Sequence, residues 1–276
     1  KWINSRLSFI YGIDFSRDNI ENQINGACVR YLKKKSEYRN IPYTVFLHGD
    51  SSKNIRNGEA IFSERHKSIN NAIFGEGPKD KTALGNGIYN VYGKGHDGFQ
   101  ISSCQFAIHY FFENPFKLKQ FIENVSTCTL VGGYFIGTCY NGSEVFEKLI
   151  KKKKGESVSL FDGSHKLWEI VKEYDTEKFN ADASSIGLAV DVYQESINQY
   201  IREYLVHFPY FIQLMNDYGF ELYDSNEKKR TLVKKGLSSF RAIFQQMKNA
   251  VDNGEIKEKD IGKANDMSDS EKEISF

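Results

Sequence analysis

The chain has 276 residues, 40% of them hydrophobic, and a formal net charge of +1 at pH 7. Such a composition is typical of a globular protein with a sizeable core, in one large or two small domains. The near-zero net charge gives no sign of a general affinity for polyanions. We interpret the basic runs Lys33–Lys35, Lys151–Lys154 and Lys228–Lys235 as solvated surface, although one or two of them could touch a nucleic-acid backbone. No apolar stretch reaches the roughly 18 residues of a membrane span, so we expect no membrane partner.

The cysteines and the first residues of the chain indicate the compartment. Cys28, Cys104, Cys128 and Cys139 are widely spaced and form no CxxC pair, which argues against a disulfide framework or a zinc site. Lys1–Ser5 lacks the apolar segment of a signal peptide. We therefore expect an intracellular protein that binds no metal.

The chain opens with alternating strands and helices. Leu7–Ile13 is a short apolar strand that ends on Asp14, and Tyr43–His48 is a second strand that leads to Asp50. Between them, apolar residues at helical spacing predict one helix over Arg17–Lys35. Two strands joined by a helix form a βαβ unit, in which the strands run parallel.

A glycine-rich stretch, Gly75–Gly98, follows a predicted helix over Ile61–Phe74. Its Gly75-Glu-Gly and Gly85-Asn-Gly turns look like phosphate-binding loops. However, no apolar strand leads into them and no clear helix follows, so we interpret this stretch as a surface loop or short hairpin.

Strand–helix alternation then continues to about residue 154. Phe99–Cys104 and Gly132–Thr138 are predicted strands, and Phe116–Cys128 and Glu144–Lys154 are predicted helices. The sequence thus predicts a doubly wound α/β fold, with a mostly parallel sheet and helices on both of its faces.

The pattern changes after residue 155. We expect antiparallel additions that extend the same sheet or form a cap above it. Their predicted strands are Ser157–Leu160, Leu167–Lys172, Leu188–Tyr193, Tyr200–Val206 and Phe220–Tyr223. Helices are predicted over Pro209–Tyr218 and Ser238–Asn249, before a polar tail.

A cluster of polar and aromatic side chains follows the strand that ends at Cys104. Residues Gln105–Glu113 combine an amide, an imidazole, a phenol and phenyl rings. Such a mixture suits a site for a flat, polar, aromatic ligand, because nucleobases stack on aromatic rings. From the residues alone, however, a core histidine within an aromatic cluster is the stronger interpretation.

These residues and their spacing resemble the mRNA cap (guanine-N7) methyltransferases, most closely the methyltransferase domain of the capping enzymes of large DNA viruses. The resemblance rests on Cys104-Gln-Phe-Ala-Ile-His-Tyr-Phe-Phe-Glu113, on Gly132-Gly-Tyr-Phe-Ile-Gly-Thr138 and on Gly49-Asp-Ser-Ser52. It implies a Rossmann-like class I S-adenosylmethionine-dependent methyltransferase fold. It also implies one domain, with a cofactor-binding core over residues 1–154 and cap-binding additions over residues 155–276.

On the cofactor side, the resemblance assigns four residues. Asp14 would accept the ribose hydroxyls of S-adenosylmethionine, Asp50 the adenine amino group with Ser51 beside it, and Gln105 would lie against the methionine end. Position alone leaves two other interpretations open: Asp14 could cap the following helix near Ser16, and Asp50 could form an Asx turn.

On the acceptor side, the resemblance places Phe106, His109 and Tyr110 against the cap guanine, with Glu203 accepting its N1–H and N2–H. Guanine N7 carries a free lone pair, so no proton leaves before attack and no general base is required. Catalysis would then consist of positioning, without a catalytic acid or base and without a metal.

The resemblance also implies missing segments. Asp14 lies too close to the start of the chain for a first strand, a glycine-rich loop and a helix to precede it, and the family continues beyond Phe276. We therefore expect a segment cut at both ends, which alone would bind S-adenosylmethionine poorly and show little activity. The larger capping enzyme would carry triphosphatase and guanylyltransferase parts and act in the host cytoplasm, a viral factory or the virion.

Three alternatives remain open at this point. The chain could be a class I methyltransferase with another substrate, or a non-catalytic scaffold or RNA-binding partner within a capping complex. A dinucleotide-dependent oxidoreductase is the weakest of the three, because no GxGxxG motif follows a strand.

Overall fold

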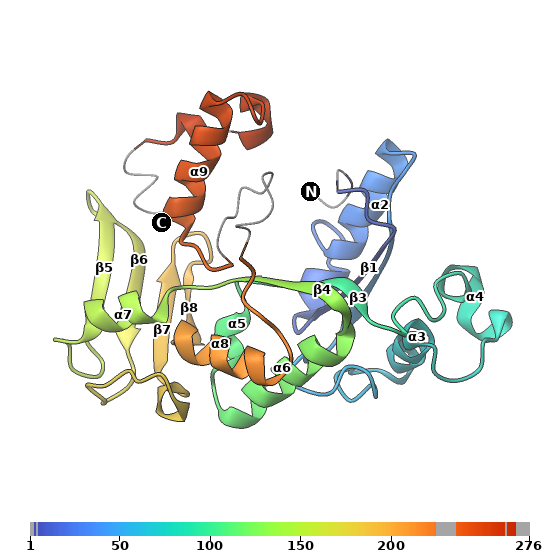
Figure 1. The fold of residues 1–276 in the computed structure, drawn as a ribbon, viewed down its shortest axis with the longest axis horizontal. Helices are drawn as coiled ribbons and strands as arrows, with labels where there is room; N and C mark the ends of the chain where they lie inside the picture. The colour runs from blue at the N-terminus through green and yellow to red at the C-terminus, as the bar shows by residue number, and fades with distance from the viewer. Residues whose placement is uncertain (1–2, 4, 225–235, 263, 269–276) are drawn as a thin grey trace.

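The computed structural model describes residues 3, 5–224, 236–262 and 264–268, and within them the chain has an α/β architecture (Figure 1). The strands are β1 (Phe9–Asp14), β2 (Tyr43–His48), β3 (Phe99–Gln105), β4 (Thr129–Thr138), β5 (Ser157–Asp162), β6 (His165–Lys172), β7 (Ala189–Gln194) and β8 (Gln199–Tyr204). The α-helices are α1 (Arg17–Glu21), α2 (Ala27–Glu37), α3 (Glu64–Phe74), α4 (Lys81–Tyr89), α5 (Ile108–Phe111), α6 (Pro115–Cys128), α7 (Gly142–Leu149), α8 (Phe208–Asp217) and α9 (Phe240–Asp252). Short 3₁₀ turns are η1 (Ala183–Ser185), η2 (Glu258–Ile261) and η3 (Ala264–Asp266). The basic run over Lys228–Lys235 lies outside the described residues.

The strands β1 and β2 pair in parallel, as predicted, with Asp14 opposite His48. The single helix predicted between them is wrong, because α1 and α2 are separate helices. Asn22 ends α1, and its side-chain Oδ1 accepts hydrogen bonds from the backbone N–H groups of Ile24 and Asn25. Asparagine readily forms such local turns, which compete with the helix.

The strands β3 and β4 form a second parallel pair. The helix α6 between them begins with Asn114, whose side chain accepts the backbone N–H of Lys117. Its apolar side packs into a core cluster with α5 and α8, which includes Ile122, Phe112 and Phe211. This packing fixes the chain that follows β3.

Backbone hydrogen bonds divide the described strands into three sheets: β1–β2, β3–β4 and β5–β6–β7–β8. The expected mostly parallel sheet is therefore present as two parallel pairs. Side chains connect the two pairs, because Phe99 of β3 stacks on Phe9 and Tyr11 of β1 at ring-centroid distances of 6.2 and 5.9 Å.

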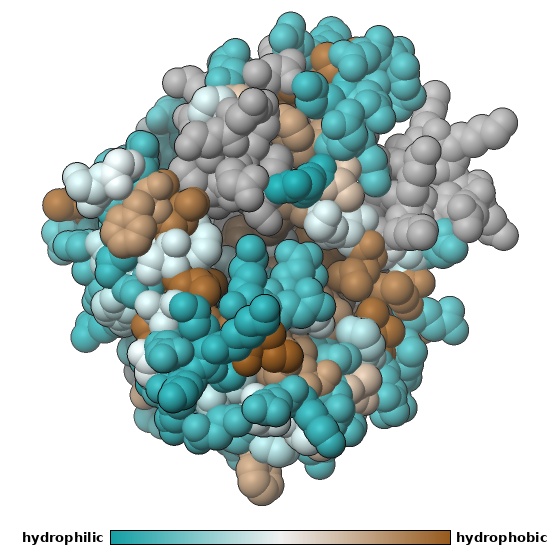
Figure 2. Space-filling model, turned by 90° about the vertical axis from the view of Figure 1, so that its left-hand side faces the viewer, coloured by the Kyte–Doolittle hydropathy of each residue, from teal (hydrophilic) through white to brown (hydrophobic). Residues whose placement is uncertain are grey.

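The four remaining strands form an antiparallel sheet, which confirms the predicted change after residue 155. They form a separate sheet beside β3 and β4, at the left in Figure 1. The helix α7 packs Phe146 and Leu149 against Val190 and Val192 on one face of this sheet. On the side of the molecule bordered by β5, hydrophilic residues surround small patches of hydrophobic residues (Figure 2).

Two other local predictions are wrong. The glycine-rich stretch contains α4, which Asp80 begins by accepting the backbone N–H groups of Thr82 and Ala83. Gly85 interrupts this helix with a φ of 71°. Because glycine is typical of turns, the glycines of this stretch indicate a loop and not a helix. No regular strand forms over Phe220–Tyr223. In the part of the chain that the structure describes, no helix has the length and apolar character to span a membrane.

Candidate functional site

The predicted cofactor residues lie at the carboxyl ends of parallel strands, where α/β sheets bind their ligands. Asp14 is the last residue of β1, and Asp50 follows β2 by two residues. The backbone N–H of Gly49 donates to the carbonyl oxygen of Asp14 at 3.0 Å, so the two strand ends are directly joined. Gln105 is the last residue of β3, in the second parallel pair.

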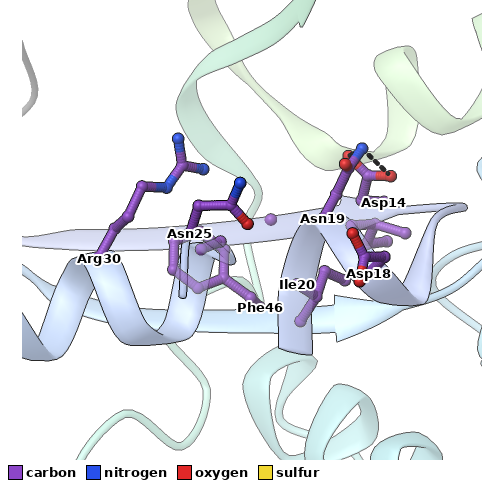
Figure 3. Close-up of a pocket in the computed structure, with 10 residues that line it drawn as sticks. Asp14, Asp18, Asn19, Ile20, Asn25, Arg30 and Phe46 are labelled. Carbon is purple, nitrogen blue, oxygen red and sulfur yellow. Dashed lines mark hydrogen bonds between the residues drawn. The ribbon is translucent and has the colours of Figure 1, made fainter. Parts of the chain in front are cut away.

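Local hydrogen bonds hold the Asp14 carboxylate. Its Oδ1 accepts from the backbone N–H of Ser16 at 2.8 Å, and the side-chain amide of Asn19 donates to both carboxylate oxygens at 3.2 and 3.3 Å. Ser16, not Asp14, caps α1. Asp14 and Asn19 line a cavity of about 580 Å³, whose far wall carries Asn25 and Arg30 (Figure 3). The carboxylate is thus oriented by its own loop beside an open cavity.

The Asx turn, which the position of Asp50 leaves open as an alternative, is present. Oδ1 of Asp50 accepts from the backbone N–H of Ser52 at 2.9 Å and from its hydroxyl at 2.6 Å. Ser51 lies between them, and its carbonyl oxygen accepts a hydrogen bond from the side chain of Asn124 in α6. An Asx turn and a ligand contact are compatible, because a carboxylate has acceptor positions on two oxygens.

Gln105 and Phe106 are fixed by Thr138 at the end of β4. The backbone N–H of Phe106 donates to the carbonyl and hydroxyl oxygens of Thr138, and the Thr138 hydroxyl donates to Oε1 of Gln105. Phe106 has a φ of 52°, an uncommon left-handed conformation for a bulky residue that often marks a functional position. Its exposed ring stacks on Phe240 of α9 at 5.9 Å, a contact that the sequence did not predict.

His109 and Glu203 form a buried pair. His109 lies on α5 and Glu203 on β8, and they are 4% and 7% exposed. His109 Nε2 and Glu203 Oε1 are 3.5 Å apart. Among the described residues, both ring nitrogens of His109 and Oε2 of Glu203 have no hydrogen-bond partner. Buried polar atoms are rarely left unpaired, so these atoms have hydrogen-bonding capacity that a ligand could use.

Burial shifts the pKa values of both His109 and Glu203. It lowers the pKa of His109 to about 4 and raises the pKa of Glu203 to about 7. At neutral pH the imidazole is therefore uncharged, and the carboxyl group is divided between its two forms. The pKa of Tyr110 is also raised, by burial and by Glu203.

Tyr140 and Gln194, which lie beside this pair, are absent from the sequence-based prediction. The ring of Tyr140 stacks on His109 at 6.1 Å, and its hydroxyl accepts a hydrogen bond from the side chain of Gln194 on β7. Tyr110 meets His109 edge-on at 4.3 Å. Tyr140 follows the Gly132–Thr138 strand by two residues, which is the signal that could have identified it.

The space beside His109, Tyr140 and Glu203 is small in this structure, with a volume of about 10 Å³. A purine can reach the pair only if a neighbouring side chain moves. Tyr110 and Tyr140, whose rings contact that of His109, are each 38% exposed. The structure thus brings His109, Tyr110 and Glu203 together, and Phe106 directly follows the end of β3. The predicted cofactor residues lie at the strand ends.

Comparison with known proteins gives this geometry a family context. The sequence model of a family described as "mRNA (guanine-N(7))-methyltransferase domain" matches residues 1–275. A "Probable mRNA-capping enzyme" of Acanthamoeba polyphaga mimivirus is 29% identical over 234 residues, which are 82% of this chain and 18% of that protein. An "mRNA cap guanine-N(7) methyltransferase" of Aspergillus niger is 29% identical over 128 residues, which are 46% of this chain and 20% of that protein. An "mRNA cap guanine-N(7) methyltransferase 1" of Arabidopsis thaliana is 30% identical over 125 residues, which are 45% of this chain and 32% of that protein. The chain thus spans a third or less of these relatives.

Proposed function

The chain belongs to the mRNA (guanine-N7)-methyltransferase domain family, and from this premise we propose that it methylates N7 of the guanine in the 5′ GpppN cap of mRNA. The cofactor would be S-adenosylmethionine, and the substrate capped RNA. The observation that carries the proposal is the buried pair of His109 and Glu203, in which both ring nitrogens of His109 and Oε2 of Glu203 have no hydrogen-bond partner among the described residues.

Guanine supplies what this pair lacks. Its N1–H and N2–H are adjacent donors, and the ionised carboxylate of Glu203 is an acceptor-only group with two oxygens. Adenine has no such pair of donors, so this contact would select guanine. Tyr110 and Tyr140 provide aromatic rings beside the pair, and the exposed ring of Phe106 would add a third. Stacking on such rings stabilises a bound base by roughly 1–3 kcal/mol.

The cofactor residues fit an adenosyl group through their donor and acceptor chemistry. Asp14 and Asp50 present carboxylates at two adjoining strand ends, where ribose hydroxyls and an adenine amino group would donate to them. Ser51 and Gln105 would add polar contacts. When bound, S-adenosylmethionine supplies a methyl group on a positively charged sulfur. The protein's part is to orient the guanine and exclude water.

No residue needs to remove a proton. Guanine N7 has a free lone pair, and His109, with its pKa lowered to about 4 by burial, is a poor base at neutral pH. His109 would therefore act by fixing the plane of the guanine, and the rate would come from alignment of the two reactants.

The finer assignments belong to the same proposal. Residues 1–154 would form a Rossmann-like cofactor-binding core and residues 155–276 the cap-binding additions. The protein would act within a larger capping enzyme with triphosphatase and guanylyltransferase parts, inside the cell in the cytoplasm or a viral factory, or in the virion.

One product analysis tests the proposal. The full-length protein is incubated with GpppA-capped RNA and S-adenosylmethionine, and the digested RNA is examined by mass spectrometry. We expect N7-methylguanosine in the cap. Methylation at another position would favour a methyltransferase with a different substrate, and cap binding without any methylation would favour the scaffold alternative.

A further inference from the structure

Asn124 of α6 is a buried amide far in sequence from the residues it contacts. It is 3% exposed. Its Nδ2 donates to the carbonyl oxygens of Ser51 at 2.9 Å and Lys53 at 2.7 Å, and its Oδ1 accepts the backbone N–H of Ile55 at 3.0 Å. One side chain thus satisfies three backbone groups of the loop that follows β2.

The loop contact reaches the predicted adenine site through one peptide group. The peptide between Ser51 and Ser52 carries both the carbonyl that Asn124 binds and the N–H that donates to Oδ1 of Asp50. The carbonyl and N–H of a trans peptide point in opposite directions. Anchoring the carbonyl on Asn124 therefore aims the N–H at the Asp50 carboxylate.

A second buried amide also binds the backbone of this loop. Asn70 of α3 is fully buried, donates to the carbonyl oxygen of Ile55 at 2.9 Å and accepts the hydroxyl of Tyr11 at 2.5 Å. Asn70 has no hydrogen bond to the Ser51–Ser52 peptide within the described structure. The two asparagines therefore differ in whether they reach Asp50, although both stabilise the fold.

We infer that Asn124 is a positioning residue for the cofactor, because its amide sets the orientation of Asp50 and Ser51 at the end of β2. This inference rests on the proposed cofactor role of these two residues. A purely structural asparagine would affect folding alone, whereas Asn124 also controls the geometry of the adenine contact.

The test compares two buried asparagines that support one loop. Asn124→Asp keeps the size and the acceptor for Ile55 but places an oxygen against the carbonyls of Ser51 and Lys53. Asn124→Ala is a second variant for the case that the aspartate does not fold, and Asn70→Asp is the matched control. Binding of S-adenosylhomocysteine and of the cap analogue GpppG to the full-length protein is measured by calorimetry, with thermal unfolding in parallel.

We expect Asn124→Asp or Asn124→Ala to weaken S-adenosylhomocysteine binding tenfold or more, with GpppG binding changed less than twofold. Asn70→Asp should change S-adenosylhomocysteine binding less than threefold. The inference is overturned if the folded Asn124 variants bind S-adenosylhomocysteine like the wild type, or if Asn70→Asp weakens it as much at the same loss of thermal stability. The same titration is carried out with Asp50→Ala. Unchanged S-adenosylhomocysteine affinity in Asp50→Ala would overturn the proposed cofactor site and this inference together. Weakened affinity in Asp50→Ala with wild-type affinity in the Asn124 variants would overturn only the inference.

Discussion

Asp14 and Glu203 are both carboxylates at the proposed site, yet they differ in exposure and in hydrogen-bond partners. Asp14 is partly exposed and accepts hydrogen bonds from Ser16 and Asn19. Glu203 is buried, and its Oε2 has no hydrogen-bond partner in the part of the chain that the structure describes. Desolvation without a partner is costly, so a fold rarely keeps such a group without a use for it.

The two sides of the proposed site therefore differ physically. On the cofactor side, carboxylates lie at the ends of parallel strands and have partners in their own loops. On the cap side, buried polar atoms keep unmet hydrogen-bonding capacity among the described residues. Variants should therefore separate the two sides, each weakening one ligand and sparing the other.

The largest effect should come from Glu203→Gln. This change removes the charge and presents an amide donor to the donor edge of guanine, and the loss of a buried charge-assisted contact costs about 2–3 kcal/mol. Calorimetry should show GpppG affinity reduced about 30- to 150-fold, with S-adenosylhomocysteine affinity unchanged. Glu195→Gln, an exposed carboxylate paired with His165, is the control and should bind both ligands normally. Equal GpppG affinity in both variants would contradict the assignment of Glu203.

A smaller effect is expected for Asp14→Asn on the other side. Its partners Ser16 and Asn19 remain, but a neutral amide accepts ribose hydroxyls less well than a carboxylate. S-adenosylhomocysteine affinity should fall about tenfold, which is a loss of about 1.4 kcal/mol of binding free energy. GpppG affinity should not change. Asp18→Asn, which lies on the wall of the same cavity, should leave both affinities within threefold of the wild type. A loss of GpppG binding in Asp14→Asn would show that the two sides are not separable.

The pH dependence should also differ between the two sides. Only the ionised Glu203 can accept both guanine donors, and its pKa is about 7 because of burial. GpppG affinity should therefore rise about tenfold from pH 6 to pH 8, as the ionised fraction rises by that factor. Titrations of Glu203→Gln should be nearly flat over this range. A wild-type affinity that does not change with pH would show that guanine binding does not depend on this ionisation.

The smallest effect concerns stability. The pKa of Glu203 is raised from 4.5 to about 7 in the folded protein, so between these values the folded state holds a proton that the unfolded chain has lost. The stabilisation is fully present below pH 4.5 and is lost as the pH rises through 7. Relative to Glu203→Gln, the wild type should lose about 1 kcal/mol of unfolding free energy between pH 6 and pH 8. Thermal unfolding of both proteins measures this, and the opposite contribution of His109 largely cancels because both proteins carry it.

The fold could be predicted from sequence where the signal is local. The strands ending at Asp14, His48 and Gln105 were found within two residues, because apolar runs and their polar ends are visible in the sequence. The helix α4 is harder to predict, because Gly85 and Gly87 are typical of a loop and only Asp80 at the N-cap indicates a helix.

Long-range partners could not be predicted in the same way. Tyr140 with Gln194, Phe106 with Phe240 and the contacts of Asn124 join residues far apart in the chain. No periodicity records such contacts, since they depend on how separate elements pack. The sequence motif therefore predicts the site residues that follow one strand, whereas the residues that surround them are known only from the structure.

The most direct test of the guanine assignment removes one atom group from the ligand. An inosine cap, IpppA, keeps N7 and N1–H but lacks the N2 amino group that Glu203 is proposed to accept, and the adenine at its other end cannot replace the guanine. We expect the wild type to bind IpppA about tenfold more weakly than GpppA, the loss of about 1.4 kcal/mol that one such hydrogen bond supplies. In Glu203→Gln this preference should fall to less than threefold. A full preference for GpppA in Glu203→Gln would contradict the account, because another group would then recognise the guanine.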